Sequence, residues 1–390
     1  MARLERVCAI GIQPGLGRTK KLLAQVGHPE KGLNFIHLAG TNGKGSTAAA
    51  IDSILRAAGF FSGLYTSPHL VDFRERFRCG GSKVKKRVLQ KHLAVLIRKI
   101  RQWPAAGRPT FFEATTVLAL LVFRDAKVGF VVWETGLGGR LDATNVIVPE
   151  CCVLTSLGRD HESVLGVGWK KIGMEKAGIL KRGVPVFSAP WPRAAQKILA
   201  SRARRLRCPW RVVKPLVQGK DRLPLEGAHQ RQNMALAIVV GRYLGFPDSI
   251  IAKGLERTVW PGRFMRLKGR YRRVLDGGHN LEGVRAALQT WQELFSEMPG
   301  RVIFGCLEDK PANEILAQLR KTGAELWGVE LQSKRGSSPL EWEVHPDRLW
   351  SSVAEAVMED ERNPTQGGTL LLGSLVLVGE VLREVRKDLE

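Results

Sequence analysis

The sequence predicts an α/β fold with two domains, the first built on a mainly parallel sheet and the second a smaller Rossmann-like unit. Strand-like and helix-like runs alternate along nearly the whole chain, which is typical of a parallel sheet with crossover helices. A chain of 390 residues is long enough for two such domains. A break at Trp260-Pro261-Gly262-Arg263, after which the alternation starts again, indicates where they join.

The first domain is predicted over residues 1–261. Its strands are short apolar runs, and its helices show apolar residues at helical spacing or end before Gly or Pro. We expect strands at 33–38, 128–133 and 153–157, and helices at 46–58, 84–102, 113–127 and 232–244.

The second domain is predicted over residues 271–390, after a linker at 262–270. About 120 residues is an ordinary domain size. We expect strands near 272–275, 301–305, 325–331 and 369–372, separated by helices near 281–296, 311–321, 348–358 and 375–387.

The composition is that of a globular protein, with 44% hydrophobic and 25% charged residues. No apolar run approaches the roughly 18 residues of a membrane span, and the N-terminus lacks the apolar core of a secretory signal. The six cysteines form no C-x-x-C pair, and the neighbours Cys151 and Cys152 are expected to be reduced strand residues. The chain is therefore predicted to be a cytoplasmic enzyme that has no membrane partner.

The net charge of +24 is unevenly distributed. Residues 271–390 hold 14 basic and 20 acidic residues, so the first 270 hold 47 basic and 17 acidic ones, a net of +30. Such a domain can attract nucleic acid, or small polyanions such as ATP and polycarboxylates. Basic clusters lie at 83–87, 202–205 and 270–273, and the first two are expected on the solvated faces of amphipathic helices. Because the basic residues are scattered along the chain, no nucleic-acid partner is expected.

A glycine-rich segment between a predicted strand and a predicted helix has the features of a phosphate loop. Its glycines let backbone amides turn toward phosphate oxygens, and the helix N-terminus adds a partial positive charge. Lys44 can reach the terminal phosphates, and Ser46 or Thr47 can face Mg²⁺. The usual G-x-x-x-x-G-K-[ST] spacing is broken, because Leu38 replaces the first Gly and Gly45 follows the lysine. The predicted ATP contacts are Thr41, Asn42, Gly43, Lys44, Gly45 and Ser46.

This loop is similar to that of the Mur ligase superfamily, and further blocks resemble folylpolyglutamate synthases and dihydrofolate synthases within it. The resemblance spans residues 12 to about 380, and Glu134-Thr135-Gly136-Leu137-Gly138-Gly139-Arg140-Leu141-Asp142 is its most specific block. A cell-wall Mur ligase is disfavoured, because only 39 residues precede Gly40 and a UDP-sugar domain would need more. The other blocks lie at 64–70, 73–76, 111–115, 155–161, 175–179, 275–280 and 373–375.

The resemblance implies an ATP-dependent ligase that adds L-glutamate to folates. ATP would phosphorylate a carboxylate of the substrate, and the glutamate amine would then attack the acyl phosphate. The sequence leaves open whether 7,8-dihydropteroate is a second acceptor. The resemblance further implies Mg²⁺ at two sites, and one closed site per chain is compatible with a monomer. A nucleic-acid-dependent P-loop ATPase is the alternative from another class, although no helicase motif set is found.

The resemblance assigns metal contacts to Ser67, Glu134 and His161. Glu134 is also favoured by its place, because it follows a buried strand of a parallel sheet, where ligands gather. His161 is a less usual ligand for Mg²⁺. Lys176 resembles the lysine that this superfamily carbamylates, so Lys176, His161 and Glu134 are the expected catalytic residues. In the structural alternatives, Glu134 is a carboxylate paired with a basic residue, and Lys176 is a plain surface lysine.

The resemblance also assigns the two ends of the substrate site. Asn233 is expected at adenine, Arg263 at the ATP phosphates and Asp276 at the nucleotide. The respective structural alternatives are a helix cap, a linker charge and a turn at a strand end. Gly17 departs from the family's frequently acidic residue, which weakens the case for dihydropteroate. The expected pterin contacts are Gly15, Leu16, Gly17, Arg18, Phe112, Glu113, Leu141 and Asp142.

Overall fold

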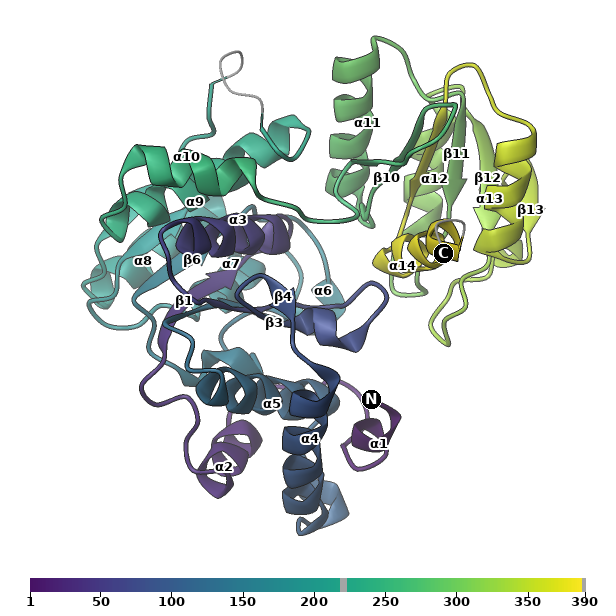
Figure 1. Ribbon diagram of the computed structural model, residues 1–390. Coiled ribbons are helices and arrows are strands. Elements are labelled where there is room, and N and C mark those ends of the chain that lie inside the picture. Colours follow the sequence, from purple (N-terminus) through teal and green to yellow (C-terminus); the bar gives the residue numbers. More distant parts are fainter. Residues whose placement is uncertain (218–222, 388–390) are drawn as a thin grey trace. The chain divides into compact units, whose positions relative to one another are not determined.

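The computed structural model describes residues 1–217 and 223–387 and separates into two compact units (Figure 1). Unit 1 comprises Met1–Pro224 with Arg231–Val259, and unit 2 comprises Leu225–Gln230 with Trp260–Glu390. The segment 225–230 lies within the predicted first domain of residues 1–261, but in the structure its contacts place it in unit 2. The α/β class with two mainly parallel sheets is confirmed.

Unit 1 contains, in its described part, an eight-stranded sheet in the order β4-β3-β2-β5-β1-β6-β7-β8. Six neighbouring strands of this order run parallel, namely β2, β5, β1, β6, β7 and β8, and β3 and β4 add an antiparallel edge. The central strand β1 is buried at every residue after the first, as expected for a parallel strand covered on both faces. The strands are β1 (Asn34–Ala39), β2 (Gly63–Tyr65), β3 (Phe77–Cys79), β4 (Ser82–Lys83), β5 (Phe130–Glu134), β6 (Cys151–Leu154), β7 (Val186–Ser188) and β8 (Trp210–Val212).

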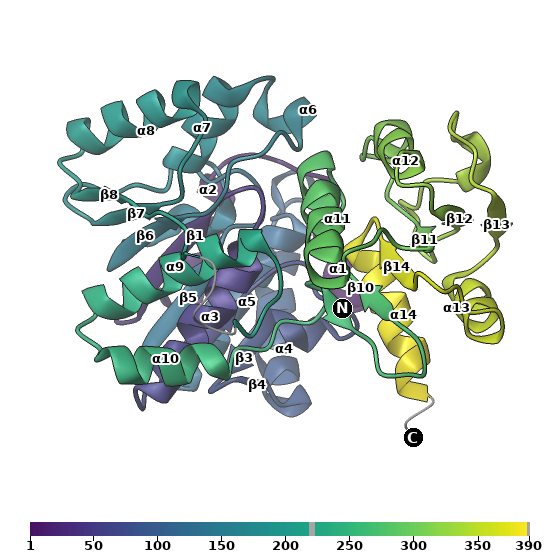
Figure 2. The same cartoon turned by 90° about the horizontal axis from the view of Figure 1, so that it is seen from above.

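Helices cover both faces of this sheet, with α3, α9 and α10 on one face and α5, with α2 and α4 packed on it, on the other (Figures 1 and 2). Helix α3 connects β1 to β2, and α5 leads the chain back from the edge strands to β5, so the two connections run in opposite directions across the sheet. Because both crossovers are right-handed, the two helices lie on opposite faces. The helices are α1 (Ala2–Glu5), α2 (Gly17–Gln25), α3 (Lys44–Ala57), α4 (Lys86–Arg101), α5 (Phe111–Asp125), α6 (Glu162–Leu165), α7 (Trp169–Ala177), α8 (Arg193–Arg205), α9 (Ala228–Tyr243) and α10 (Asp248–Glu256), with 3₁₀ turns η1 (Phe73–Arg76), η2 (Ala105–Gly107) and η3 (Ala143–Val146).

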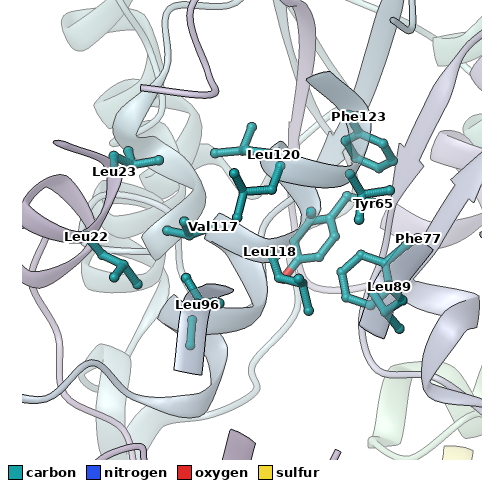
Figure 3. Packing of buried hydrophobic residues seen from close by; sticks show 14 of the residues in the cluster. Leu22, Leu23, Tyr65, Phe77, Leu89, Leu96, Val117, Leu118, Leu120 and Phe123 are labelled. Atoms are coloured by element: carbon teal, nitrogen blue, oxygen red, sulfur yellow. The ribbon is translucent and has the colours of Figure 1, made fainter. Parts of the chain in front are cut away.

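Helix α5 is the centre of a large apolar cluster of unit 1. Its residues Val117, Leu118 and Phe123 are buried between β2 and β3 on one side and α2 and α4 on the other (Figure 3). A capping box fixes the start of the helix, since Glu113 N donates to Thr110 Oγ1 at 3.2 Å and Thr110 N donates to Glu113 Oε2 at 2.7 Å. The first turn of α5 is thereby held rigidly at one end of the core.

Unit 2 contains a six-stranded sheet in the order β13-β12-β11-β14-β10-β9, parallel except for β9. It has its own apolar core around Trp291, Val302 and Leu316. Its elements are β9 (Met265–Arg266), β10 (Arg273–Leu275), β11 (Arg301–Phe304), β12 (Glu325–Val329), β13 (Arg348–Trp350), β14 (Thr369–Leu372), α11 (Leu281–Phe295), α12 (Ala312–Arg320), α13 (Val353–Arg362), α14 (Leu375–Lys387) and the 3₁₀ turn η4 (Pro339–Glu341).

Three local predictions are wrong. The helix expected at 348–358 begins only at Val353, because Ser352 Oγ accepts from Glu355 N at 3.2 Å and caps it, whereas 348–350 pair with β12. The expected linker 262–270 contains β9, which pairs antiparallel with β10. The basic cluster at 83–87 is only partly helical, since Ser82–Lys83 form β4 and α4 begins at Lys86.

All six cysteines are free thiols, and Cys151 and Cys152 are buried in β6 as predicted. Burial raises the pKa of the Cys152 thiol to about 12, so it stays protonated near neutral pH. In the described part of the chain, none of the helices has the length and apolar character required to span a bilayer.

Candidate active site

The phosphate loop lies where β1 ends and α3 begins, as predicted. Gly43 caps α3 with a φ of 86°, a left-handed conformation that favours glycine. A Cβ at Gly43 would lie 2.2 Å from Asn233 Oδ1, so the predicted adenine contact Asn233 lies directly against the loop. A Cβ at Gly40 would lie 1.8 Å from Thr155 Oγ1. Both glycines are therefore required by close approach.

The segment after β6 braces the loop. Thr41 N donates to Ser156 O at 2.8 Å, and Thr41 Oγ1 donates to Gly158 O at 2.9 Å. Ser156 Oγ donates to Asn42 O at 3.0 Å. These contacts join the ends of two neighbouring parallel strands, β1 and β6, at the edge of the sheet where α/β proteins bind ligands. Sequence reasoning missed the bracing role of Ser156, although Thr155-Ser156 was among the matching blocks.

Two lysines converge on one carbonyl of this loop. Lys44 Nζ donates to Gly40 O and Thr41 O, each at 3.1 Å, and Lys176 Nζ donates to Gly40 O at 2.8 Å. Lys176 is only 4% exposed. Burial, and then the neighbouring charge of Lys44, lower the pKa of Lys176 to about 7. A large fraction of Lys176 is therefore a neutral amine near pH 7, which a surface lysine would not be.

The predicted metal contacts Ser67 and Glu134 lie together. Glu134 ends β5 next to Leu38 of β1, and its side chain is 4% exposed. Ser67 N donates to Glu134 Oε2 at 3.0 Å. Burying a carboxylate is costly unless it is paired or holds a cation, so this position suits a metal ligand.

His161 follows the bracing segment and caps α6 with a left-handed φ of 54°. Its backbone N donates to Asp160 Oδ1 at 2.9 Å, and its Nε2 lies 3.8 Å from Asp160 Oδ2. Across residues 1–217 and 223–387, no three His, Cys, Asp or Glu side chains form a cluster that could hold a metal by themselves. The predicted set of Ser67, Glu134 and His161 includes only two such side chains, so it would need hydroxyl and phosphate oxygens to complete it.

The phosphate loop offers such an oxygen. Ser46 Oγ is buried at the start of α3, and it has no hydrogen-bond partner among the described residues. A hydroxyl left without a partner is costly in a folded protein, and hydroxyl and carboxylate oxygens are the ligands that Mg²⁺ prefers. The Ser46 hydroxyl and the Glu134 carboxylate, which lie after β1 and at the end of the neighbouring strand β5, are therefore oxygen donors of the kind that Mg²⁺ takes.

The predicted nucleotide contacts Arg263 and Asp276 lie together in unit 2. Asp276 Oδ2 accepts from Phe264 N and Asp276 Oδ1 accepts from Gly278 N, both at 2.7 Å. Arg263 Nη1 donates to Gly262 O at 2.9 Å, and it would lie 2.5 Å from a Cβ at Gly277. The Asp276 carboxylate thus organises the turn after β10, and the guanidinium of Arg263 lies across that turn.

The structure also brings the predicted pterin segments together. Gly15 N donates to Leu141 O at 3.4 Å, and Arg18 Nε donates to Glu113 Oε2 at 2.9 Å. The ring of Phe112 would lie 2.4 Å from a Cβ at Gly136, so it packs on the loop after β5. Leu16 precedes α2 and Gly17 begins it. Glu113 Oε1 is buried and has no hydrogen-bond partner among the described residues, so it can accept from a ligand amine.

Asp142 is more constrained than the sequence indicates. Its Oδ2 accepts from the backbone amides of Gly136 and Leu137 at 3.0 and 2.8 Å, and its Oδ1 accepts from Thr144 N and Thr144 Oγ1. His37 Nε2 lies 3.0 Å from Thr144 Oγ1. Because Thr144 gives its proton to Asp142, His37 must donate through Nε2. Sequence reasoning missed His37, whose only signal is a polar residue in the apolar strand β1, and it gave no role to Thr144, although Thr144 belongs to the same matching block as Asp142.

A mainly parallel sheet with a phosphate loop at its centre, followed by a second α/β unit, defines an ATP-dependent ligase of the Mur type. The chain is 32% identical over 417 residues to the dihydrofolate synthase/folylpolyglutamate synthase of Bacillus subtilis, with 96% of each chain covered. It is 31% identical to the folylpolyglutamate synthase of Lacticaseibacillus casei, covering 93% of this chain and 92% of that one. The chain belongs to the folylpolyglutamate/dihydrofolate synthase family.

Solved structures agree with this assignment. E. coli FolC in complex with DHPP and ADP superposes with a TM-score of 0.90 at 29% identity, covering 100% of this chain and 97% of that one. Mycobacterium tuberculosis folylpolyglutamate synthase complexed with ADP and AMPPCP gives a TM-score of 0.86 at 26% identity, covering 95% of each chain. No family model matches the chain.

Proposed function

We propose that this chain joins L-glutamate to a folate carboxylate at the expense of ATP, through an acyl phosphate. The observation that carries the proposal is the meeting of Lys44 and Lys176 at Gly40 O, in a phosphate loop next to the buried carboxylate of Glu134. The relatives named for this activity, aligned over nearly the whole chain, support it. Other members of the family have been solved with ADP, AMPPCP, folate or DHPP.

The phosphate loop has the groups that an ATP-dependent acylation needs. The backbone amides of Thr41–Ser46 and the N-terminus of α3 would bind phosphate oxygens, and Lys44 would exchange its two loop carbonyls for the terminal phosphates. Ser46, Ser67, Glu134 and His161 would hold Mg²⁺ at two sites. When bound, Mg²⁺ would screen the phosphate charge from the incoming carboxylate.

Lys176 is proposed to act as a carbamate. A neutral amine attacks CO₂, forms the N–C bond and releases one proton, and a lysine whose pKa is about 7 supplies that neutral amine. The product carries a carboxylate at the position where Lys176 Nζ now meets Gly40 O. Such a carboxylate would add a further oxygen ligand beside the phosphate loop.

The remaining residues would orient the two substrates. Asn233 at the loop would contact adenine, while Arg263 and Asp276 would contact the nucleotide from unit 2. For the folate, Phe112 offers an aromatic face and Glu113 Oε1 offers an acceptor that has no partner in the described structure. Gly15, Leu16, Gly17, Arg18, Leu141 and Asp142 would frame the pterin.

The test is incubation of the purified full-length chain with ATP, Mg²⁺ and L-glutamate, with tetrahydrofolate or 7,8-dihydropteroate in separate reactions. We expect phosphate release and a product that is heavier by one glutamyl unit with tetrahydrofolate. The dihydropteroate reaction decides whether dihydrofolate synthesis is a second activity. Failure to form product with either acceptor would refute the proposed function.

We further propose that residues 1–261 act as the ATP-binding domain, 271–390 as the ligase domain, and that the enzyme works as a cytoplasmic monomer. One set of candidate residues in the described chain is compatible with a monomer as the working unit. Sedimentation of the protein with and without ATP would test this oligomeric state.

A further inference from the structure

The loop after β5 packs directly against the end of α7 that carries Lys176. Arg140 N donates to Glu175 O at 2.8 Å, and Arg140 Nε donates to Glu175 Oε1 at 2.9 Å. A Cβ at Gly139 would lie 2.9 Å from Glu175 O and 3.2 Å from Lys176 O. A Cβ at Gly178 would lie 2.2 Å from Arg140 Cβ. Two glycines, one in each segment, therefore allow the loop to approach the backbone of Lys176.

Asn145 joins the same two segments through its side-chain amide. Its Nδ2 donates to Arg140 O at 3.0 Å, in the loop, and to Gly178 O at 3.2 Å, just after α7. Its Oδ1 accepts from Lys181 Nζ at 2.8 Å, and the residue is only 5% exposed. Both hydrogens of the amino group are used and the carbonyl faces an ammonium, so only this orientation of the amide suits its neighbours.

Lys176 lies between the two points at which the end of α7 is held. The preceding residue, Glu175, is hydrogen-bonded to the loop, and so is Gly178, two residues further on. A helix of nine residues is too short to be stable by itself, so tertiary contacts hold its end in place. The position of Lys176 Nζ, which donates to Gly40 O at 2.8 Å, therefore depends on these contacts.

The same loop contains Asp142, a proposed pterin contact. Arg140 and Asn145 lie on either side of Asp142 in the sequence. Within the loop, Asp142 N donates to Gly139 O at 3.2 Å and Asn145 N donates to Asp142 O at 2.9 Å. The loop proposed to hold the pterin and the helix end that carries Lys176 are therefore one hydrogen-bonded body.

We propose that Asn145 is a positioning residue for Lys176. Its two N–H bonds hold the end of α7 so that Lys176 Nζ lies at Gly40 O, where the carbamate would form. This inference rests on the proposed function. Because protein groups use the whole amide of Asn145, the residue acts through Lys176 and not on a substrate.

Two variants remove this hold, and two matched controls leave it in place. Asn145→Asp keeps the shape of the side chain and puts an oxygen opposite the two carbonyl oxygens that Nδ2 now contacts, so both bonds are lost. Asn145→Ser removes the amide without adding a charge. Lys181→Met removes the ammonium from Oδ1 and leaves both bonds of Nδ2. Asn34→Asp replaces an exposed amide that donates to Gly129 O at 3.1 Å.

The experiment measures the carbamate by ¹³C NMR in ¹³C-labelled bicarbonate at constant pH, and the absence of its signal in Lys176→Met assigns it. In both variants at position 145 we expect the bicarbonate concentration for half-maximal signal to rise about ten-fold, the cost of losing roughly one hydrogen bond. Their kcat at saturating substrates should fall and recover as bicarbonate is raised, which a merely structural loss would not do. Lys181→Met and Asn34→Asp should keep the half-maximal concentration of the parent.

An unchanged half-maximal concentration in the folded variants at position 145 would overturn the proposal, as would an equal rise in Lys181→Met. A parent chain without a carbamate signal would overturn it as well, since Asn145 would then have no reactive position to set. Carbamate formation without glutamate incorporation by the parent would instead refute the proposed function. The half-maximal concentrations would still decide the role of Asn145 in that case.

Discussion

Two ammonium groups that share the carbonyl of Gly40 determine the chemistry of the phosphate loop. Lys44 is half-buried and Lys176 is buried, and both donate to Gly40 O. Because like charges repel, the proton is less favourable on the buried lysine, where desolvation already opposes it. The loop thereby pairs a lysine suited to phosphate with one suited to reaction as a neutral amine.

Replacement of Lys176 by methionine tests this division of roles. We expect ligation to fall by about 10² or more, the usual cost of losing an electrostatic contact to the reacting groups. Lys176→Arg should be equally inactive, because a guanidinium keeps the positive charge and forms no carbamate. Phosphate release is the assay, and intact protein mass in bicarbonate should show CO₂ uptake by the parent chain. Activity near that of the parent in both variants would contradict the proposed role.

The same residue predicts a pH dependence of stability. The pKa of Lys176 is lowered from 10.5 to about 7 in the folded chain, so between these values the unfolded state binds more protons. The free energy of unfolding should therefore gain a contribution that increases from pH 7 to pH 10, on the order of 4 kcal/mol. Below pH 7 the burial penalty is fully present and constant. Denaturant unfolding of the parent and of Lys176→Met, compared across this range, should show the rise only in the parent.

Thr144 links His37 to Asp142 and so shapes the loop proposed to hold the pterin. Thr144→Val removes a donor to Asp142 and an acceptor for His37, leaving two buried groups short of partners. We expect a loss of about 1–3 kcal/mol in stability. We also expect KM for the folate to rise while KM for ATP changes little. Thr290→Val, which removes a buried hydroxyl bonded within α11, is the control for a threonine-to-valine substitution. An equal rise in the folate KM of Thr290→Val would disprove the link between Thr144 and the pterin loop.

At the scale of elements, the turn into α3 is the place where we propose that the nucleotide phosphates bind. Gly43 and Gly59 lie near opposite ends of this helix with φ values of 86° and 88°. A Cβ at Gly59 would meet nothing within 4 Å, whereas a Cβ at Gly43 would meet Asn233. The two glycines thus share the backbone requirement and differ in what surrounds them.

This pair gives a matched experiment. Gly43→Ala and Gly59→Ala should each destabilise the chain by about 1 kcal/mol through the left-handed backbone. Only Gly43→Ala should also weaken ATP binding, by at least about ten-fold, because the loop must shift away from Asn233. Binding of a fluorescent ATP analogue and thermal unfolding measure the two effects. Equal ATP affinity in the two variants would show that the contact with Asn233 has no influence on the loop.

Most elements could be predicted because their signals are local. The loop glycines, the apolar strand before Glu134 and the apolar periodicity of α5 and α11 all read directly from the sequence. The start of α13 could have been found from Ser352 and Glu355, whose spacing is a capping signal. The strand β9 could not, since two residues become a strand only through pairing with β10.

The predicted site residues were recognised through motif blocks, and the structure adds which of these residues lie close together. Proximity of Lys176 to Gly40, or of Asn233 to Gly43, depends on packing between segments more than 100 residues apart. Asn145 belongs to the segment that resembles the family around Asp142, yet its bonds to Gly178 and Lys181 join positions more than 30 residues apart and had no sequence signal. Burial and pairing over long sequence separations are the properties that a single sequence leaves undetermined.

At the scale of the whole molecule, the two units differ in charge and each has its own core. Within unit 2, the core is closed by a buried ion network. Arg301 is 8% exposed at its side chain and donates to Asp360 Oδ1 at 2.7 Å, while its guanidinium lies 3.9 Å from the centre of the Trp327 ring. Thr369 Oγ1 also donates to Asp360, at 2.6 Å. The network joins β11, β14 and α13.

Asp360→Ala should therefore destabilise unit 2 selectively. Removal of Asp360 leaves Arg301 paired with Glu325 at 2.9 Å but takes away its second carboxylate and the acceptor of Thr369 Oγ1, so we expect a loss of about 1–3 kcal/mol. Because each unit has a separate core, we expect calorimetry to resolve a transition for unit 2 that shifts to lower temperature, with the transition of unit 1 unchanged. Glu297→Ala, which removes an exposed ion pair with Arg272 in the same unit, should shift neither. If both transitions move together in Asp360→Ala, the units unfold as one cooperative body, and the division of the chain into two separately stable units is wrong.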